Sequence, residues 1–252
     1  MSVTAALETR DLFMRFGGLT VANKISLAIE RGVRQALIGP NGAGKTTLVN
    51  LLTGALAPTG GRVILEGVDI TGEPQHRRVA RGLVRTFQVS QLFPGMSPLE
   101  ATTLAVAQRR GATARWWRSL ASHSAVIEEA AALLDRLGLL DCAHEQTRNL
   151  PYGRQRLLEI GLALALEPSV LLLDEPAAGV PEGESAELFA TLAELPRTVT
   201  VLLIEHDMDL VFRFAERITV LVRGSILVEG PPARISADPN VREVYLGEAE
   251  HG

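Results

Sequence analysis

The sequence predicts an α/β fold with an inserted helical lobe. Short, continuous apolar runs are typical of strands that are buried on both faces, and helical patterns lie between them. One long stretch, residues 88–150, has no strand pattern and is rich in Ala, Leu, Arg and Glu. A length of 252 residues is typical of one α/β domain with an insertion, and 46% hydrophobic residues suffice for a buried core.

The hydrophobic pattern orders the elements along the chain. Residues 7–38 predict β structure, because two segments mix apolar and polar positions as half-exposed strands do. We expect strands at Leu7–Phe13, Val21–Ile29, Arg34–Ile38, Arg62–Leu65, Gly82–Phe87, Val170–Asp174, Thr198–Ile204, Arg217–Leu221 and Ser225–Val228. We expect helices at Thr46–Leu56, Pro98–Gln108, His123–Leu137, Arg154–Leu166, Glu184–Leu195 and Asp207–Ala215.

Composition and charge weigh against several classes of function. A formal net charge of −4 argues against sequence-independent nucleic-acid binding, which needs a basic surface. The one cysteine, Cys142, allows no disulfide within the chain, which fits a reducing compartment. No apolar run approaches the roughly 20 residues that cross a bilayer, and residues 1–10 lack the pattern of a secretory signal. If this protein acts at a membrane, we expect another chain to span it.

The strongest motif is GPNGAGKT, which follows a predicted strand and precedes a predicted helix. It matches the phosphate-loop pattern G-x-x-x-x-G-K-S/T in full. Its glycines let backbone N–H groups turn toward phosphate oxygens, and the helix that follows directs its positive end to the same charge. We expect Lys45 to reach the β- and γ-phosphates, Thr46 to offer a hydroxyl to Mg²⁺, and Thr47 to add a phosphate contact. The predicted nucleotide-binding residues of this loop are Gly39, Pro40, Asn41, Gly42, Ala43, Gly44, Lys45, Thr46 and Thr47.

Two acidic residues end the apolar run Val170–Leu173. Asp174 stands at the exposed end of a buried strand, where its carboxylate can hold Mg²⁺, usually through water. Glu175 follows directly, points elsewhere, and suits a general base for an attacking water. An acidic strand end that caps a helix is the alternative, and it would be preferred in the absence of the phosphate loop.

The stretch NLPYGRQRLLEIGLALALEP, residues 149–168, resembles the signature of ABC ATPases, usually LSGGQ followed by a helix. The resemblance covers essentially the whole chain. It implies a P-loop NTPase core at residues 1–87 and 151–252, with a mixed sheet flanked by helices and an antiparallel β subdomain, and a helical signature subdomain at 88–150. It also implies an ATPase that uses ATP and Mg²⁺ in a sandwich of two such domains. Tyr152 and Gly153 of one domain would then face the phosphate loop of the other.

Three further positions are assigned by the resemblance. Gln88, in VRTFQ, resembles the glutamine that the family uses near Mg²⁺ and the attacking water; taken alone, it would be a polar residue at a strand end. His206, at the end of an apolar strand, resembles the switch histidine that hydrogen-bonds the γ-phosphate; taken alone, it would more often be a structural residue with its hydrogen bonds satisfied. Phe16, in MRFGG, matches the position at which an aromatic ring stacks on adenine, with core packing as the alternative for this ring.

Two prolines depart from the family pattern. Pro151 stands where Ser is usual, and proline has neither a hydroxyl nor a backbone N–H, so one γ-phosphate hydrogen bond is lost. Pro181 replaces the Asp or Asn that is common in the loop after the core strand. We therefore expect the phosphate-loop half of each site to be complete and the half donated across the dimer to be altered.

Segments RFGGLTVANKISL, LVRTFQVSQLF, DEPAAG and DPNVREVYLGE resemble the branch that energises uptake of branched-chain amino acids and similar solutes. This implies a peripheral subunit on the cytoplasmic face of the inner membrane. Its implied partners are transmembrane permease subunits, a second, identical or homologous, ATPase subunit and, indirectly, a periplasmic solute-binding protein, with no nucleic acid. A soluble ABC ATPase acting on nucleic acid or ribosomes is the alternative, disfavoured by the acidic charge. A lone P-loop kinase or GTPase would leave the signature stretch without a role.

The segment RRGATARWWRSLASHS, residues 109–124, places four arginines around Trp116 and Trp117. Basic residues with tryptophan suit a membrane interface or a permease contact. They equally suit a solvated arm with two packed indoles, and the sequence favours neither.

Overall fold

The computed structural model describes residues 5–86, 92–111 and 124–249, with side chains for all of these except 245–249. The described residues form two compact units. The first contains the residues up to Arg85, Ser169–Glu175, and those from Pro196 on; the second contains the remainder. The second unit therefore extends beyond the predicted lobe of 88–150. No helix in the described part of the chain is long and apolar enough to cross a membrane.

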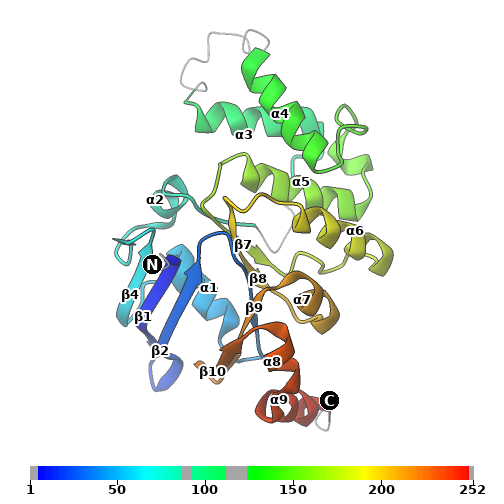
Figure 1. Cartoon of the computed structure of the whole chain (residues 1–252). Helices are drawn as coiled ribbons and strands as arrows, with labels where there is room; N and C mark the ends of the chain where they lie inside the picture. The colour runs from blue at the N-terminus through cyan, green and yellow to red at the C-terminus, as the bar shows by residue number, and fades with distance from the viewer. Residues whose placement is uncertain (1–4, 87–91, 112–123, 250–252) are drawn as a thin grey trace. The chain divides into compact units, whose positions relative to one another are not determined.

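The first unit is built on two sheets (Figure 1). The antiparallel sheet has the order β2-β1-β4-β5 and contains β1 (Ala5–Phe16), β2 (Leu19–Glu30), β4 (Gly60–Leu65) and β5 (Val68–Asp69). The larger sheet has the order β10-β9-β3-β8-β7-β6 and contains β3 (Arg34–Ile38), β6 (Leu83–Arg85), β7 (Val170–Asp174), β8 (Thr200–Ile204), β9 (Arg217–Val222) and β10 (Ser225–Gly230). Its neighbours pair in parallel except β9 and β10, which pair antiparallel. The predicted α/β class, with a mixed sheet and an antiparallel β subdomain, is confirmed.

Helix α1 (Lys45–Thr53) packs into the core of this unit. Four of its apolar residues belong to the same buried cluster as residues of β1, β2, β7 and β8: Leu48, Val49, Leu51 and Leu52. Each such side chain contributes about 1.5–3 kcal/mol when it leaves water. The helix ends at Gly54, which has a φ of 78° and forms a left-handed C-cap, so it stops short of the predicted end at Leu56.

The candidate site residues of the first unit lie at the carboxyl ends of the parallel strands. Every residue of β7 and β8 is buried, and Asp174 pairs with Ile204 across the two strands. Since β3, β6, β7 and β8 run in the same direction, the residues that follow them emerge at one edge of the sheet. That edge receives the phosphate loop, Arg85, Asp174 and, beyond β8, His206.

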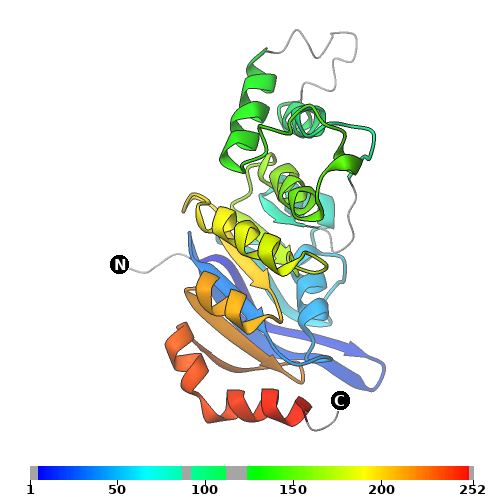
Figure 2. The same ribbon diagram turned by 90° about the vertical axis from the view of Figure 1, so that its right-hand side faces the viewer.

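Four further helices belong to the first unit: α2 (Gln75–Ala80), α7 (Met208–Phe214), α8 (Pro232–Ala237) and α9 (Pro239–Ala249). Of these, only α7 was predicted from the pattern. The other three begin at or beside a proline, a start signal that the hydrophobic periodicity does not contain. Helix α8 packs against β9 and β10, and α9 follows it at the red end of the chain (Figure 2).

The second unit is helical in its described part. It contains α3 (Pro98–Arg109), α4 (Ser124–Arg136), the short 3-10 helix η3 (Thr147–Asn149), α5 (Tyr152–Leu164) and α6 (Glu182–Ala193). Helix α3 packs on α4 and α5, and α5 packs on α6. A capping box starts α3, because the Ser97 N–H donates to Glu100 Oε2 at 2.8 Å and Ser97 Oγ accepts from the Glu100 N–H at 3.3 Å. Pro151 and Pro181 are the N-caps of α5 and α6, so both helices start two residues earlier than predicted.

Candidate functional site

The phosphate loop, residues 39–46, connects the end of β3 to the start of α1. A Cβ atom on Gly39 would collide with the backbone carbonyl oxygen of Leu221, so only glycine fits at that position. The Ala43 carbonyl oxygen accepts the N–H of Gly224 at 2.8 Å. The loop is therefore fixed from outside by the hairpin between β9 and β10.

Lys45 lies over the phosphate loop. Its Nζ donates to the carbonyl oxygens of Gly39 at 2.5 Å and Pro40 at 3.0 Å. Thr46 is exposed and Thr47 is half-buried. The first N–H groups of a helix have no acceptor within it, so the start of α1 presents donors and partial positive charge beside the ammonium group. A chain of phosphates is the ligand that this combination suits.

Asp174 is buried and already has a cationic partner. Its carboxylate is 7% exposed, and its Oδ2 forms a close ion pair with Nη2 of Arg85 at the end of β6. The other terminal nitrogen of Arg85, Nη1, donates to the Asn50 side-chain oxygen on α1 at 2.9 Å. Sequence analysis predicted Asp174 and missed both partners.

Glu175 follows Asp174 with a backbone φ of 48°, in the left-handed region that non-glycine residues rarely adopt. Its N–H donates to the Ile204 carbonyl at 2.9 Å, which holds this turn against β8. The side chain is half-buried. Backbone strain of this kind persists where surrounding structure imposes it, and it is concentrated at functional sites. The prediction that the Glu175 carboxylate points away from that of Asp174 stays a prediction.

His206 is mainly exposed, with 70% of its side-chain surface accessible. Glu205, the residue before it, is 1% exposed, and its Oε2 accepts the His206 N–H at 2.9 Å. His206 Nδ1 lies 3.5 Å from the same oxygen. The buried carboxylate thus anchors the backbone of the histidine and leaves the outer part of the ring to a ligand.

Phe16 is the last residue of β1, and 47% of its surface is exposed. Leu19, its neighbour across the turn, is 67% exposed. Core packing therefore does not account for this ring. An exposed aromatic face is free to stack on a flat ligand such as a nucleobase.

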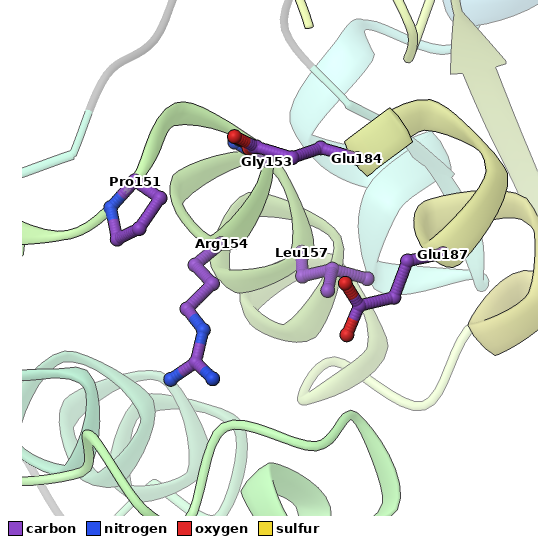
Figure 3. A pocket seen from close by; sticks show the side chains of 6 residues that line it. All are labelled: Pro151, Gly153, Arg154, Leu157, Glu184 and Glu187. Atoms are coloured by element: carbon purple, nitrogen blue, oxygen red, sulfur yellow. The ribbon is translucent and has the colours of Figure 1, made fainter. Parts of the chain in front are cut away.

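In the second unit, a backbone N–H at the start of α5 donates a hydrogen bond to a glutamate side chain. The Gly153 N–H donates to Glu184 Oε2 on α6 at 2.8 Å. Figure 3 shows Glu184 next to Gly153, whereas the side chain of Arg154 points away from both. Pro151, the N-cap, gives no side-chain hydrogen bond to the helix. Glu184 thus supplies from another helix the acceptor that a serine cap would supply locally.

Tyr152 is packed between neighbours in the same unit. The Arg156 guanidinium lies 5.1 Å from the centroid of its ring. A Cβ atom on Gly179 would lie 3.3 Å from the ring edge, so the loop after β7 and the first turn of α5 are in close contact. Gln88, Trp116 and Trp117 lie outside the described residues.

The residues at the sheet edge suit a hard cation that arrives with phosphates. Asp174 and Thr46 offer oxygen donors, which Mg²⁺ prefers, and Mg²⁺ is usually held by one or two carboxylates together with substrate phosphates. The described residues contain no group of three His, Cys, Asp or Glu side chains that could hold a metal ion by themselves. The donor set therefore fits Mg²⁺ bound together with a nucleotide.

A glycine-rich loop between a strand and a helix, at the same sheet edge as a strand that ends in an aspartate followed by a glutamate, is the arrangement of P-loop nucleotide-binding proteins. The first unit defines this class by its geometry.

Comparisons with known proteins define the family. The ABC transporter family model matches residues 22–178, and that of the branched-chain amino acid ATP-binding cassette transporter matches residues 225–251. The high-affinity branched-chain amino acid transport ATP-binding protein BraF of Pseudomonas aeruginosa is 42% identical over 252 residues, which cover 96% of this chain and 98% of the relative. A probable branched-chain amino acid transport ATP-binding protein, LivG of Archaeoglobus fulgidus, is 35% identical, with 96% and 95% covered. The crystal structure of an ATP-binding cassette of an ABC transporter, in its ADP conformation, matches with a TM-score of 0.84 and 31% identity, over 96% of this chain and 99% of that chain.

The chain belongs to the ABC transporter family. It is an ATP-binding cassette, the subunit type that binds nucleotide and hydrolyses ATP, and the resemblance identified in the sequence is confirmed.

Proposed function

We propose that this chain hydrolyses ATP to drive import of branched-chain amino acids or related solutes through membrane permease subunits. The observation that carries the proposal is the phosphate loop, held open between β3 and α1, with Lys45 over it and Asp174 and Glu175 at the same sheet edge. The solute class rests on the relatives and on the match of residues 225–251 to the branched-chain family model.

Each predicted side chain has one role in the proposed reaction. Lys45 exchanges its backbone carbonyl partners for β- and γ-phosphate oxygens when ATP binds. Glu175 accepts the proton of the water that attacks the γ-phosphate, and His206 donates a hydrogen bond to that phosphate. Thr46 and Asp174 would hold Mg²⁺, which would supply positive charge to neutralise the phosphate oxygens.

Three further roles complete the nucleotide site. Gln88, which lies outside the described residues, would serve Mg²⁺ and the attacking water, as the family resemblance implies. The exposed Phe16 ring stacks on adenine. Tyr152 and Gly153 serve the nucleotide of a second cassette, identical or homologous, in a sandwich of two. This last role requires a phosphate to take over the Gly153 N–H, which Glu184 holds in the isolated chain.

The other partners follow from the same family. We propose a position on the cytoplasmic face of the inner membrane, held there by permease subunits, with a periplasmic solute-binding protein as an indirect partner. Phe93, in the described part of the stretch before α3, is 63% exposed and offers an apolar contact to a permease.

The proposal is tested with two variants and one control. Lys45→Ala removes the phosphate-binding ammonium and should abolish ATP binding. Glu175→Gln should bind ATP, lose about 100-fold or more in turnover, and accumulate a dimer visible by size-exclusion chromatography. Glu194→Gln, an exposed acid at the end of α6, should hydrolyse ATP like the wild type. Normal turnover by Glu175→Gln would refute the assignment of the base.

The solute is tested separately. Vesicles that contain this subunit with its permeases and binding protein should accumulate labelled leucine in an ATP-dependent manner, and Lys45→Ala should stop the uptake. Uptake of an unrelated solute, without leucine, would contradict the proposed solute class and leave the ATPase role intact.

A further inference from the structure

We propose that Arg85 is a positioning residue of the nucleotide site: it holds Asp174 in register with the helix that follows the phosphate loop, and so sets the affinity for Mg²⁺. The inference rests on the proposed function, since it concerns the Mg²⁺ that would accompany ATP. It assigns a role to a side chain outside the predicted nucleotide and metal residues.

The geometry of Arg85 is that of a bridge between two elements. Its two terminal nitrogens reach different acceptors, the carboxylate of Asp174 on β7 and the side-chain oxygen of Asn50 on α1. Arg85 pairs with Leu172 in the adjacent parallel strand, and its guanidinium reaches Asp174, two residues further along β7. One side chain therefore links the acidic strand end to the phosphate-loop helix.

The link on α1 is placed one helical turn from a predicted metal residue. Thr46 and Asn50 are four positions apart, so they share one face of α1. Arg85 Nη1 donates a hydrogen bond to Asn50 on that face, and Nη2 forms the ion pair with Asp174. The separation between Thr46 and Asp174, the two predicted metal residues described by the structure, is thus controlled by a third side chain that binds neither phosphate nor metal.

Burial explains why the pair needs an arginine. The side chains of Arg85 and Asp174 are 18% and 7% exposed, so each charge has lost most of its water and depends on the other. A guanidinium presents donors in a rigid, planar fork, whereas a lysine ammonium is a compact charge on a flexible chain. Arg85 Nε is buried and has no hydrogen-bond partner among the described residues. Among the described residues, both hydrogen-bonded nitrogens of Arg85 therefore belong to the bridge.

The bridge occupies one oxygen of Asp174. Arg85 Nη2 pairs with Oδ2, which fixes the rotation of the carboxylate and the direction of its second oxygen. That second oxygen would therefore be oriented in advance to bind Mg²⁺ or to accept a hydrogen bond from its water. Groups that orient metal-binding carboxylates in this way typically change metal affinity about 10–100-fold when they are removed.

The test measures the Mg²⁺ dependence of nucleotide binding, which needs no turnover. The probe is mant-AMP-PNP, a fluorescent ATP analogue with a non-hydrolysable bridge between its β- and γ-phosphates. Its affinity is measured first with EDTA and then along a Mg²⁺ titration, for the wild type, Arg85→Gln and Arg85→Lys. Arg85→Gln should keep the EDTA affinity within a few fold and should need about tenfold more Mg²⁺ for the half-maximal gain. Arg85→Lys should lie between the two, because it keeps the charge and loses the bridge.

Two variants guard against a general loss of structure. Arg217→Gln breaks a different ion pair of the same unit, between Arg217 and Glu229 at 2.6 Å, and should titrate with Mg²⁺ like the wild type. Asn50→Ala removes only the α1 end of the bridge and should also raise the Mg²⁺ requirement. This variant, with Arg85→Lys, decides the question if Arg85→Gln does not fold.

The outcomes separate the two proposals. If the wild type does not bind the analogue, the proposed function fails and the role of Arg85 falls with it. If the wild type binds and the Arg85 and Asn50 variants keep its Mg²⁺ requirement, only the positioning role is overturned, and the pair serves folding alone. A lower Mg²⁺ requirement in Arg85→Gln would also overturn it, by making Arg85 a competitor of the metal.

Discussion

Replacing Glu184 with alanine should loosen the start of α5. The perturbation removes the only acceptor that the structure gives the Gly153 N–H, a hydrogen bond of 2.8 Å to a carboxylate. A buried donor left without an acceptor costs about 1–3 kcal/mol. The lost attraction between an acid and a helix start adds about 0.3–1 kcal/mol. We expect a local destabilisation of about 2 kcal/mol.

Hydrogen exchange measures this local effect more directly than a global unfolding curve, because the chain has two units. Since about 1.4 kcal/mol corresponds to a factor of ten, the Gly153 amide should exchange roughly tenfold to thirtyfold faster in Glu184→Ala. Glu184→Gln keeps a neutral acceptor and should show a smaller increase.

Glu187→Ala is the matched control. Glu187 lies on the same helix and lines the same pocket, but its side chain is exposed (Figure 3). It should leave the exchange at the start of α5 unchanged. Equal exchange in the Glu184 and Glu187 variants would refute the view that Glu184 caps this helix.

Three further predictions concern single positions. Gly39→Ala should fail to bind nucleotide, because its Cβ atom would collide with the Leu221 carbonyl; wild-type affinity for mant-AMP-PNP would contradict this. Cys142 should react with a thiol reagent only after unfolding, since burial raises the pKa of its thiol and its Sγ contacts the Leu139 carbonyl at 3.3 Å; rapid labelling of the native chain would count against it. Pro151→Ser should raise thermal stability by adding a cap worth about 0.5–2 kcal/mol and should leave ATPase activity intact or higher. A large loss of activity would mean that the proline is required.

The features that the sequence predicted correctly are local ones. The phosphate loop is defined by consecutive residues, and β7 and β8 consist mainly of consecutive buried apolar residues. The features that it missed depend on neighbours far along the chain. Arg85 meets Asp174 only because β6 pairs with β7, and strand order is not contained in a hydrophobic pattern. The same holds for Glu184, which reaches Gly153 from another helix.

The predicted ends of three helices were wrong for a different physical reason. Periodicity continued through Gly54 to Leu56, but the left-handed conformation of the glycine ended α1 first. At Pro151 and Pro181 the error was in the other direction, since each proline was treated as part of a loop although both start a helix.

The hairpin that supports the phosphate loop also bears on how the protein is made. Gly224 donates to Ala43, and β3 gains its parallel neighbours β8 and β9 only from the last part of the chain. The phosphate loop leaves the ribosome early, whereas Gly224 and the hairpin between β9 and β10 are synthesised near the end of the chain. Contacts of such high sequence separation form late and slowly. We therefore expect the nascent chain to carry the complete nucleotide motif through most of translation without a formed site, and a product that ends before residue 224 to lack ATPase activity.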